Sequence, residues 1–313
     1  MLSRTAEHLY WMGRYIERAD FLARVLDAAL RLASLPARTG AEHQPWESAI
    51  ASSGARWEFR QTHSRAEENT VRDFLAFSTL NRSSISSCLS AARTNARSIR
   101  TALTVELWET INEAYNQLSR FEEARHDREA FIGFLDWVKA TTLAFDGASH
   151  RTMLRNDGYW FLRLGAEIER ADNTARLLDV KYHLLLPPDE PVGGGLDYFQ
   201  WATLLREVSA LTAYRWLYRD SLKPWLIADL LILNRKMPRS LASCQEATVH
   251  FLNEMADAYG RRGPSQRLAT AMLSRLQSQN IESIFQGGLH EFIQEFLRQN
   301  AKLGATISDQ YLS

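Results

Sequence analysis

The segment "YIERADFLARVLD" at residues 15–27 returns later in the chain as "EIERADNTARLLD" at residues 167–179. When Gly13 is aligned with Gly165, ten of the fifteen positions that begin at these glycines carry identical residues. Two unrelated segments would share about one, because roughly twenty residue types are available. We interpret the match as two long helices related by an internal duplication. The alternative is two separate helices that meet the same physical demand.

Helical periodicity places the charged residues of each copy on one face. Steps of three and four residues stay on one side of a helix, here within about 80° of arc. A glycine inside a helix costs about 1 kcal/mol relative to alanine, so two glycines at the same register indicate close approach of another backbone or a ligand. The first stripe consists of Gly13, Glu17, Asp20, Arg24 and Asp27, and the second of Gly165, Glu169, Asp172, Arg176 and Asp179.

Two interpretations of these acidic stripes stay open. In the first, the Asp–Arg pairs at i,i+4 spacing form structural ladders that hold helices in register. In the second, the stripes converge across a pseudo-twofold axis and line a polar pocket that binds a metal or an amine, or holds catalytic groups. The candidates are Glu17 and Glu169 for catalysis, and Glu17, Arg18, Asp20, Arg24, Glu169, Arg170, Asp172 and Arg176 for ligand binding.

The sequence predicts no resident metal or cofactor. Helical di-iron proteins use Glu-x-x-His on facing helices. In this chain the equivalent three-residue steps are Glu17–Asp20 and Glu169–Asp172, without a histidine. Magnesium, which prefers carboxylate and phosphate oxygens, is the alternative metal.

The composition argues against several classes of protein. The 37 Lys+Arg residues balance the 37 Asp+Glu residues, so the chain lacks the basic excess of nucleic-acid-binding proteins. The longest apolar run, residues 224–233, contains Asp229 and is too short to span a membrane. Cys88 and Cys244 lack metal-ligand spacing and are typical of reduced thiols, and no signal peptide is expected at the N-terminus. We therefore expect a cytoplasmic protein that binds neither nucleic acid nor membrane.

Apolar residues recur at three- and four-residue steps along almost the whole chain, which predicts an all-α helical bundle. Residues 56–63 come nearest to a strand pattern, but a short loop explains them equally well. Residues 36–59 are expected to be irregular, and 186–197, with three prolines and three glycines, to form a loop. We expect about ten helices, near 3–35, 64–78, 83–103, 106–121, 127–154, 155–186, 198–218, 224–234, 241–259 and 266–303, the last broken near residues 287–288.

We expect a single helical domain, 1–313, with two related halves at about 1–154 and 155–313. Neither half alone looks self-sufficient. Between two of the expected helices, Arg235, Lys236 and Arg239 form a small basic cluster that is expected at the surface.

Four segments together resemble the bacterial alpha-E family, which is also catalogued as a domain of unknown function. The resemblance covers essentially the whole chain. One departure is Ala166, which stands where the family pattern has an arginine, at the position that matches Arg14 in the first copy. The segments are "LSRTAEHLYWMGRYIERAD" (2–20), "NARSIRTALTVELWETIN" (95–112), "LRLGAEIERADNTARLLDVKY" (162–182) and "PRSL" (238–241).

The resemblance implies an all-helical protein that occurs beside, or fused to, circularly permuted ATP-grasp proteins, often with transglutaminase-like proteins. That context implies ATP-dependent amide-bond formation on a peptide or small amino compound, with magnesium present only with ATP on the partner ligase. The motif positions that carry over, without an assigned role, are Glu17, Arg18, Asp20, Glu169, Arg170 and Asp172.

Three functional hypotheses follow. The leading one is an accessory helical protein that docks on an ATP-grasp ligase and holds an amine-bearing ligand at the acidic stripes, since a partly desolvated carboxylate attracts a cation strongly. The second is an enzyme in its own right, with Glu17 or Glu169 as general base or with the carboxylates binding magnesium. The third is a purely structural interaction protein. Self-association is compatible with all three.

Overall fold

The protein is all-α, as the periodicity predicts. The computed structural model describes residues 1–34, 44–184 and 195–312, and within these ranges every regular element is a helix. Fifteen of these are α-helices, more than the expected number, because two predicted helices are divided and a segment predicted to be irregular forms two more.

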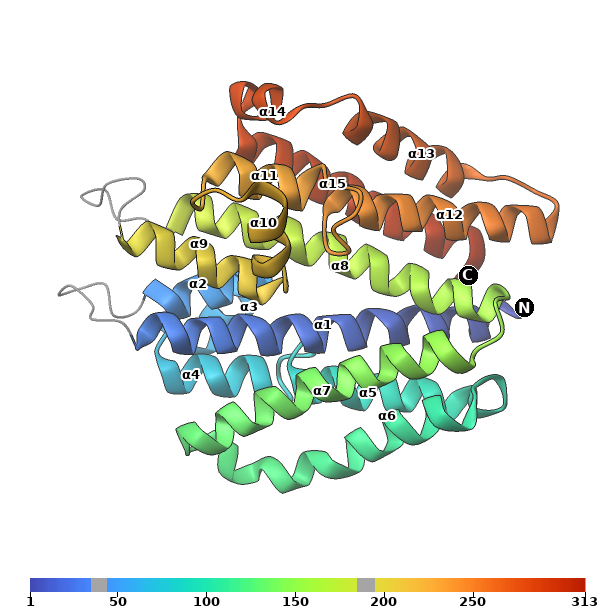
Figure 1. Cartoon of the computed structure of the whole chain (residues 1–313). Coiled ribbons are helices and arrows are strands. Elements are labelled where there is room, and N and C mark those ends of the chain that lie inside the picture. The colour runs from blue at the N-terminus through green and yellow to red at the C-terminus, as the bar shows by residue number, and fades with distance from the viewer. Residues whose placement is uncertain (35–43, 185–194, 313) are drawn as a thin grey trace.

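Two long helices form the centre of the molecule. Helix α1 (Ser3–Ala33) makes its most extensive contact with α8 (Asp157–Leu184), and the two run side by side through the bundle (Figure 1). Each central helix has its own flanking pair, while α2 and α9 contact both. The flanking helices are α5 (Ile85–Ser98) and α7 (Arg128–Thr152) on α1, and α12 (Leu241–Tyr259) and α15 (Leu289–Ile307) on α8.

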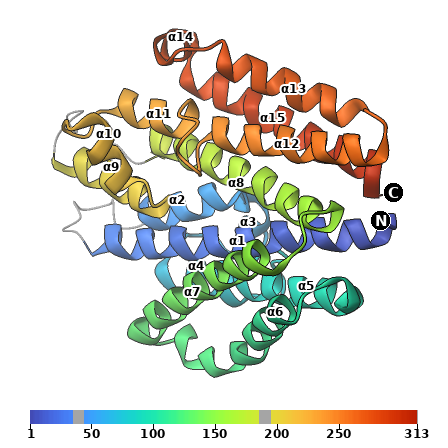
Figure 2. The same cartoon turned by 45° about the vertical axis from the view of Figure 1, so that its right-hand side comes forward.

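Of the remaining helices, α6 packs on the outside of α5 and α7, and α13 and α14 pack on the outside of α12 and α15 (Figure 2). Polar side chains begin several of the elements where the sequence predicts a start. Ser84, Thr104, Asp127 and Ser240 each accept a hydrogen bond from a backbone N–H of the first turn that follows. The other bounds are α2 Gln44–Ser53, α3 Arg56–Thr62, α4 Glu68–Arg72, α6 Val105–Gln117, α9 Gly195–Glu207, α10 Leu211–Tyr218, α11 Pro224–Ile232, α13 Pro264–Gln277 and α14 Ile281–Gly287.

The two stripe glycines allow α1 and α8 to approach backbone to backbone. A Cβ added to Gly13 would overlap the carbonyl oxygen of Leu162, and one added to Gly165 would overlap the carbonyl oxygen of Tyr10. The close approach predicted from these glycines is therefore confirmed, and the neighbour is another backbone. Matching positions of the repeat lie at the same level of two parallel helices.

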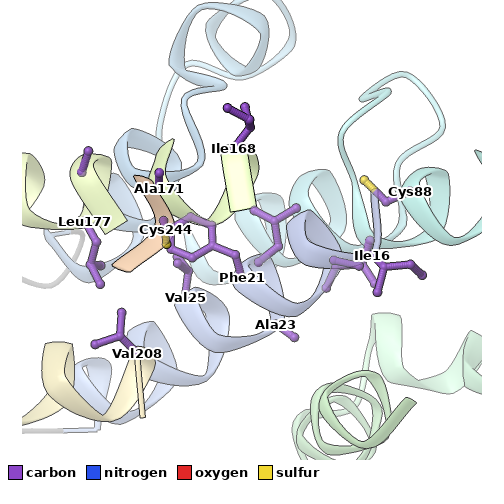
Figure 3. Close-up of a cluster of buried hydrophobic side chains, with 14 of the residues drawn as sticks. Ile16, Phe21, Ala23, Val25, Cys88, Ile168, Ala171, Leu177, Val208 and Cys244 are labelled. Atoms are coloured by element: carbon purple, nitrogen blue, oxygen red, sulfur yellow. The ribbon is translucent and has the colours of Figure 1, made fainter. Parts of the chain in front are cut away.

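Apolar side chains fill the space around this contact. Phe21 and Val25 of α1 lie near Ile168, Ala171 and Leu177 of α8 in the buried cluster (Figure 3), and all are at most 5% exposed. Both cysteines are buried free thiols within the same core.

The prediction of an irregular segment at residues 36–59 is wrong for its described part. Helices α2 and α3 occupy most of residues 44–62, including the segment that came nearest to a strand pattern. Ala49 and Ile50 follow Trp46 by three and four residues, and all three side chains are buried. This helical periodicity covers few residues and lies among Pro, Gly and Ser residues. Their preference for turns is the reason why the sequence predicts an irregular segment.

Two predicted helices are divided. Residues 198–218 form α9 and α10, separated at Ser209, whose φ is 55°. Residues 266–303 break at the expected Gly288, with φ 91°, and also between α13 and α14. Most of the predicted loop at 186–197 lies outside the described residues, and its last three begin α9. The internal duplication and the division into two halves stay predictions.

Replacing either stripe glycine by alanine should destabilise the fold. Gly13→Ala and Gly165→Ala each force two helix backbones apart, so we expect a loss of about 2–3 kcal/mol in the free energy of unfolding. The matched control is Gly133→Ala in α7, where an added Cβ meets nothing within 4 Å. In Gly133→Ala the free energy of unfolding should rise by about 0.5–1 kcal/mol. Urea unfolding of the three variants checks this; equal effects at all three sites would contradict the packing argument.

Candidate functional site

The glutamate of the second stripe is held by two arginines of α1. Arg18 donates from Nε to Oε1 of Glu169 (2.6 Å) and from Nη2 to Oε2 (3.1 Å), a two-pronged ion pair. Arg14 donates from Nε to the same Oε2 (2.8 Å). A third contact fixes Arg18 further, since its Nη1 donates to Ser83 Oγ (3.0 Å). These four residues are called the Glu169 cluster below.

The glutamate of the first stripe has a matching environment. Arg170 of α8 donates from Nη2 to Oε2 of Glu17 (2.7 Å), and Arg239 donates from Nη1 to Oε1 (2.6 Å). Arg239 also donates from Nη2 to Oδ2 of Asp20 (2.6 Å). The other oxygen of Asp20 accepts a hydrogen bond from the hydroxyl of Thr142 (3.0 Å). These five residues are called the Glu17 cluster.

The two clusters exchange partners across the α1–α8 contact. Each Glu-Arg step sends its glutamate to the arginine of the other step, so Glu17 meets Arg170 and Glu169 meets Arg18. This exchange needs both helices at the same level, which the glycine contact provides. Glu17 and Arg18, which are adjacent in sequence, therefore belong to different clusters.

The second arginine of each cluster has a different origin. Glu169 receives Arg14, one turn before Arg18, but the matching position in α8 is Ala166. At Glu17 the missing cation is replaced by Arg239, from the segment between α11 and α12. The departure noted in the sequence is therefore compensated by a residue far away in the chain.

Both glutamates are strongly held in the ionised form. Their exposed fractions are 6% for Glu17 and 3% for Glu169. Burial by itself would raise the pKa of Glu169, but the charges of Arg18 and Arg14 outweigh it and lower the pKa to about 2. The pKa of Glu17 is likewise well below its ordinary value, because Arg170 and Arg239 outweigh the burial.

The two acidic stripes do not form one common pocket. Glu169, Asp172 and Arg176 line a cavity of about 330 Å³, called the polar cavity below, whereas Glu17 and Asp20 line a separate cavity of about 60 Å³. The two cavities share no lining residue. The aspartates form the expected pairs within each helix, Asp20 with Arg24 (2.7 Å) and Asp172 with Arg176 (2.6 Å).

The described ranges contain no group of three or more His, Cys, Asp or Glu side chains placed to hold a metal ion. Glu17, Asp20, Glu169 and Asp172 instead pair with guanidinium groups. In the same part of the chain, no helix is long and apolar enough to cross a membrane.

Arg239 is the main residue that the sequence interpretation misplaced. The sequence predicts a surface position for it and for its basic neighbours, yet its side chain is only 16% exposed and bridges Glu17 and Asp20. Arg235 fits the expectation, since its side chain is 65% exposed and pairs with Glu246. The one available signal was Arg239's position inside the "PRSL" segment that carries the family resemblance.

The comparison with protein families gives one match. The model of Alpha-E, described as a predicted α-helical domain with a conserved ER motif, matches residues 1–312. The chain therefore belongs to the Alpha-E family. Its Glu-Arg steps are Glu17–Arg18 and Glu169–Arg170, the two that exchange partners between α1 and α8. The search of curated proteins and the search of solved structures give no match.

The stability contributed by Glu169 should depend on pH in a defined window. Because its folded-state pKa is lowered from 4.5 to about 2, the contribution is complete above about pH 4.5 and is lost as the pH falls toward 2. At pH 7, Glu169→Gln should cost about 3–5 kcal/mol, since two largely buried arginines lose their partner. Urea unfolding from pH 7 downward should show this difference shrinking below pH 4.5. The control, Glu109→Gln on exposed α6, should stay within about 0.5 kcal/mol at every pH.

Arg239 and its neighbour Arg235 offer a second matched pair. Arg239→Gln leaves Glu17 and Asp20 partly unpaired in a buried setting, so we expect a loss of about 3–5 kcal/mol. Arg235→Gln removes an exposed ion pair and should change stability by less than about 1 kcal/mol. Thermal unfolding of both variants distinguishes the two roles, and a small effect at Arg239 would mean that its bridge is not needed for the fold.

Proposed function

We propose that this Alpha-E protein is an accessory binding protein of an ATP-grasp amide ligase, and that it holds a peptide or small amino compound while the partner performs the chemistry. The observation that carries this proposal is the state of the two candidate glutamates. Each is buried and bound by two arginines, and Glu169 lines a cavity large enough for a small molecule.

Such glutamates are poor general bases. A general base works best with a pKa near the operating pH and with an oxygen free to take a proton. Glu169 has a pKa of about 2, and both of its oxygens accept hydrogen bonds from arginines. Because arginines already bind the oxygens of Glu17 and Glu169, little room is left for magnesium or an amine at these two carboxylates. The geometry therefore favours a scaffolding role for the glutamate pair.

Asp172 is the stripe carboxylate best suited to an amine. Its side chain is 19% exposed, lines the polar cavity, and uses Oδ2 for Arg176. A cation that reaches it stays partly desolvated, which strengthens the attraction. We place the amino group of the held compound there.

Exposed aromatic side chains support a protein partner. Trp216 of α10 is 76% exposed and Trp225 of the adjoining helix α11 is 49% exposed. Large exposed apolar groups of this kind are typical of interaction surfaces. We place the ligase on this face of α10 and α11.

The test is complex formation and turnover with a genome-adjacent ATP-grasp protein. We expect a complex in size-exclusion chromatography with light scattering, and ATP-dependent amide formation only when both proteins are present. Turnover by this chain alone, lost in Glu17→Gln or Glu169→Gln, would instead favour the enzyme. The double variant Trp216→Ser/Trp225→Ser should weaken the complex at least about tenfold, or 1.4 kcal/mol. Trp57→Ser, 71% exposed on α3, is the control and should leave the complex intact.

A further inference from the structure

The polar cavity lies between helices of both halves of the chain. Its walls come from α1, α2, α8, α15 and the segment before α5, so it is built by the assembled bundle and not by one helix. With a volume of about 330 Å³, it falls at the small end of ligand pockets. Three arginines and two carboxylates carry its charge: Arg14, Arg18 and Arg176 against Glu169 and Asp172.

The charges leave one positive charge without a counterpart in the lining. Glu169 and Asp172 contribute two negative charges against the three guanidinium groups. A partly enclosed cavity strengthens the attraction of this excess for an anion. One carboxylate group is enough to pair with this excess, so the excess favours a carboxylate group over a phosphate dianion.

A buried amide group provides a donor without a protein acceptor. Asn173 of α8 is 5% exposed and lines the cavity, and its Nδ2 has no hydrogen-bond partner among the described residues. Asn300 of α15 also lines the cavity and donates to the carbonyl oxygen of Ile168, while its Oδ1 has no partner in the same part of the chain. Buried polar groups without partners cost about 1–3 kcal/mol each, so such a pair indicates a missing polar ligand.

Two glycines keep the cavity open. Gly54 has a φ of +71°, and an added Cβ would lie 2.9 Å from Nη1 of Arg176, so this residue leaves room for the guanidinium. Gly304 lies within α15, where a Cβ would make only ordinary contacts at 3.5 Å and beyond. Alanine would suit this helix better by about 1 kcal/mol. Gly304 therefore widens the cavity at some cost to the helix.

We propose that the polar cavity binds the carboxylate of a small amino-acid-like compound through its surplus arginine charge and the free amide donor of Asn173. The assignment deepens the proposed function, because it concerns the same site at which Asp172 is placed to receive the amine. A carboxylate and an amine are the two groups that an amide ligase joins. The ligand class is thus a compound that carries both, of the size of one or two amino acids.

The test uses acetate as the probe for the carboxylate and acetamide as its neutral isostere. Titration of the full chain with [1-¹³C]acetate, followed by NMR, should show saturable binding in the millimolar range, which is what four heavy atoms can provide. Acetamide should bind at least tenfold more weakly. No saturation by about 100 mM acetate, or tighter binding of inorganic phosphate, would overturn the assignment.

Two variants tie the binding to this cavity. Asn173→Ala removes a donor that has no protein partner, so the fold should keep its stability while acetate binding falls at least fivefold. Arg176→Gln should weaken binding similarly, because it removes the surplus charge and only one helical ion pair. The controls are Asn116→Ala, exposed on α6, and Arg24→Gln, the repeat counterpart of Arg176 outside the cavity. Equal acetate affinity in Asn173→Ala and Asn116→Ala would overturn the proposal.

The outcomes also separate this inference from the proposed function. Methylammonium, the probe for the amine, reports on Asp172, and complex formation with the ATP-grasp protein reports on the partner. Acetate binding without a ligase complex leaves the cavity assignment standing and removes the proposed function. A ligase complex with methylammonium binding but no acetate binding removes the cavity assignment and leaves the proposed function standing.

Discussion

The exchange of glutamate and arginine between α1 and α8 is the constraint on which the rest of the bundle depends. Burying four charges costs free energy that is recovered only when every charge meets its partner with good geometry. A shift of one residue along either helix would turn the side chains by about 100° and leave buried charges unpaired. The exchange therefore fixes the register of the central pair, and Gly13 and Gly165 allow the distance at which it operates. The flanking helices then pack on a rigid centre.

Much of this fold follows from local sequence patterns. The recurrence of apolar residues gives the helices, and polar residues such as Ser84 and Asp127 mark their starts because they satisfy free backbone N–H groups. The close approach of the central helices follows from glycines inside otherwise strong helical sequence. The short helices α2 and α3 could not be predicted in this way, since two or three turns of periodicity do not outweigh a composition typical of turns.

The partners in the site could not be predicted in the same way. Spacing along one helix tells which side chains share a face, so the pairs Asp20–Arg24 and Asp172–Arg176 follow from sequence. It does not tell which helix lies opposite. The ion pair between Arg239 and Glu17 joins residues 222 positions apart and depends on how a whole segment returns to the centre. Tertiary packing alone decides such contacts.

The two copies of the repeat differ in where the second arginine of each cluster comes from, and this difference decides which copy leaves room for a ligand. At Glu17, Arg239 enters from outside the central pair, also binds Asp20, and leaves a cavity of only about 60 Å³. At Glu169, the second arginine comes from α1 itself, and about 330 Å³ stays open with its own charge excess. The Glu17 step of the repeat is thus completed by protein and serves the fold. The other keeps the same ion pairs and leaves room for a ligand, so the fold and the site rest on one repeated motif.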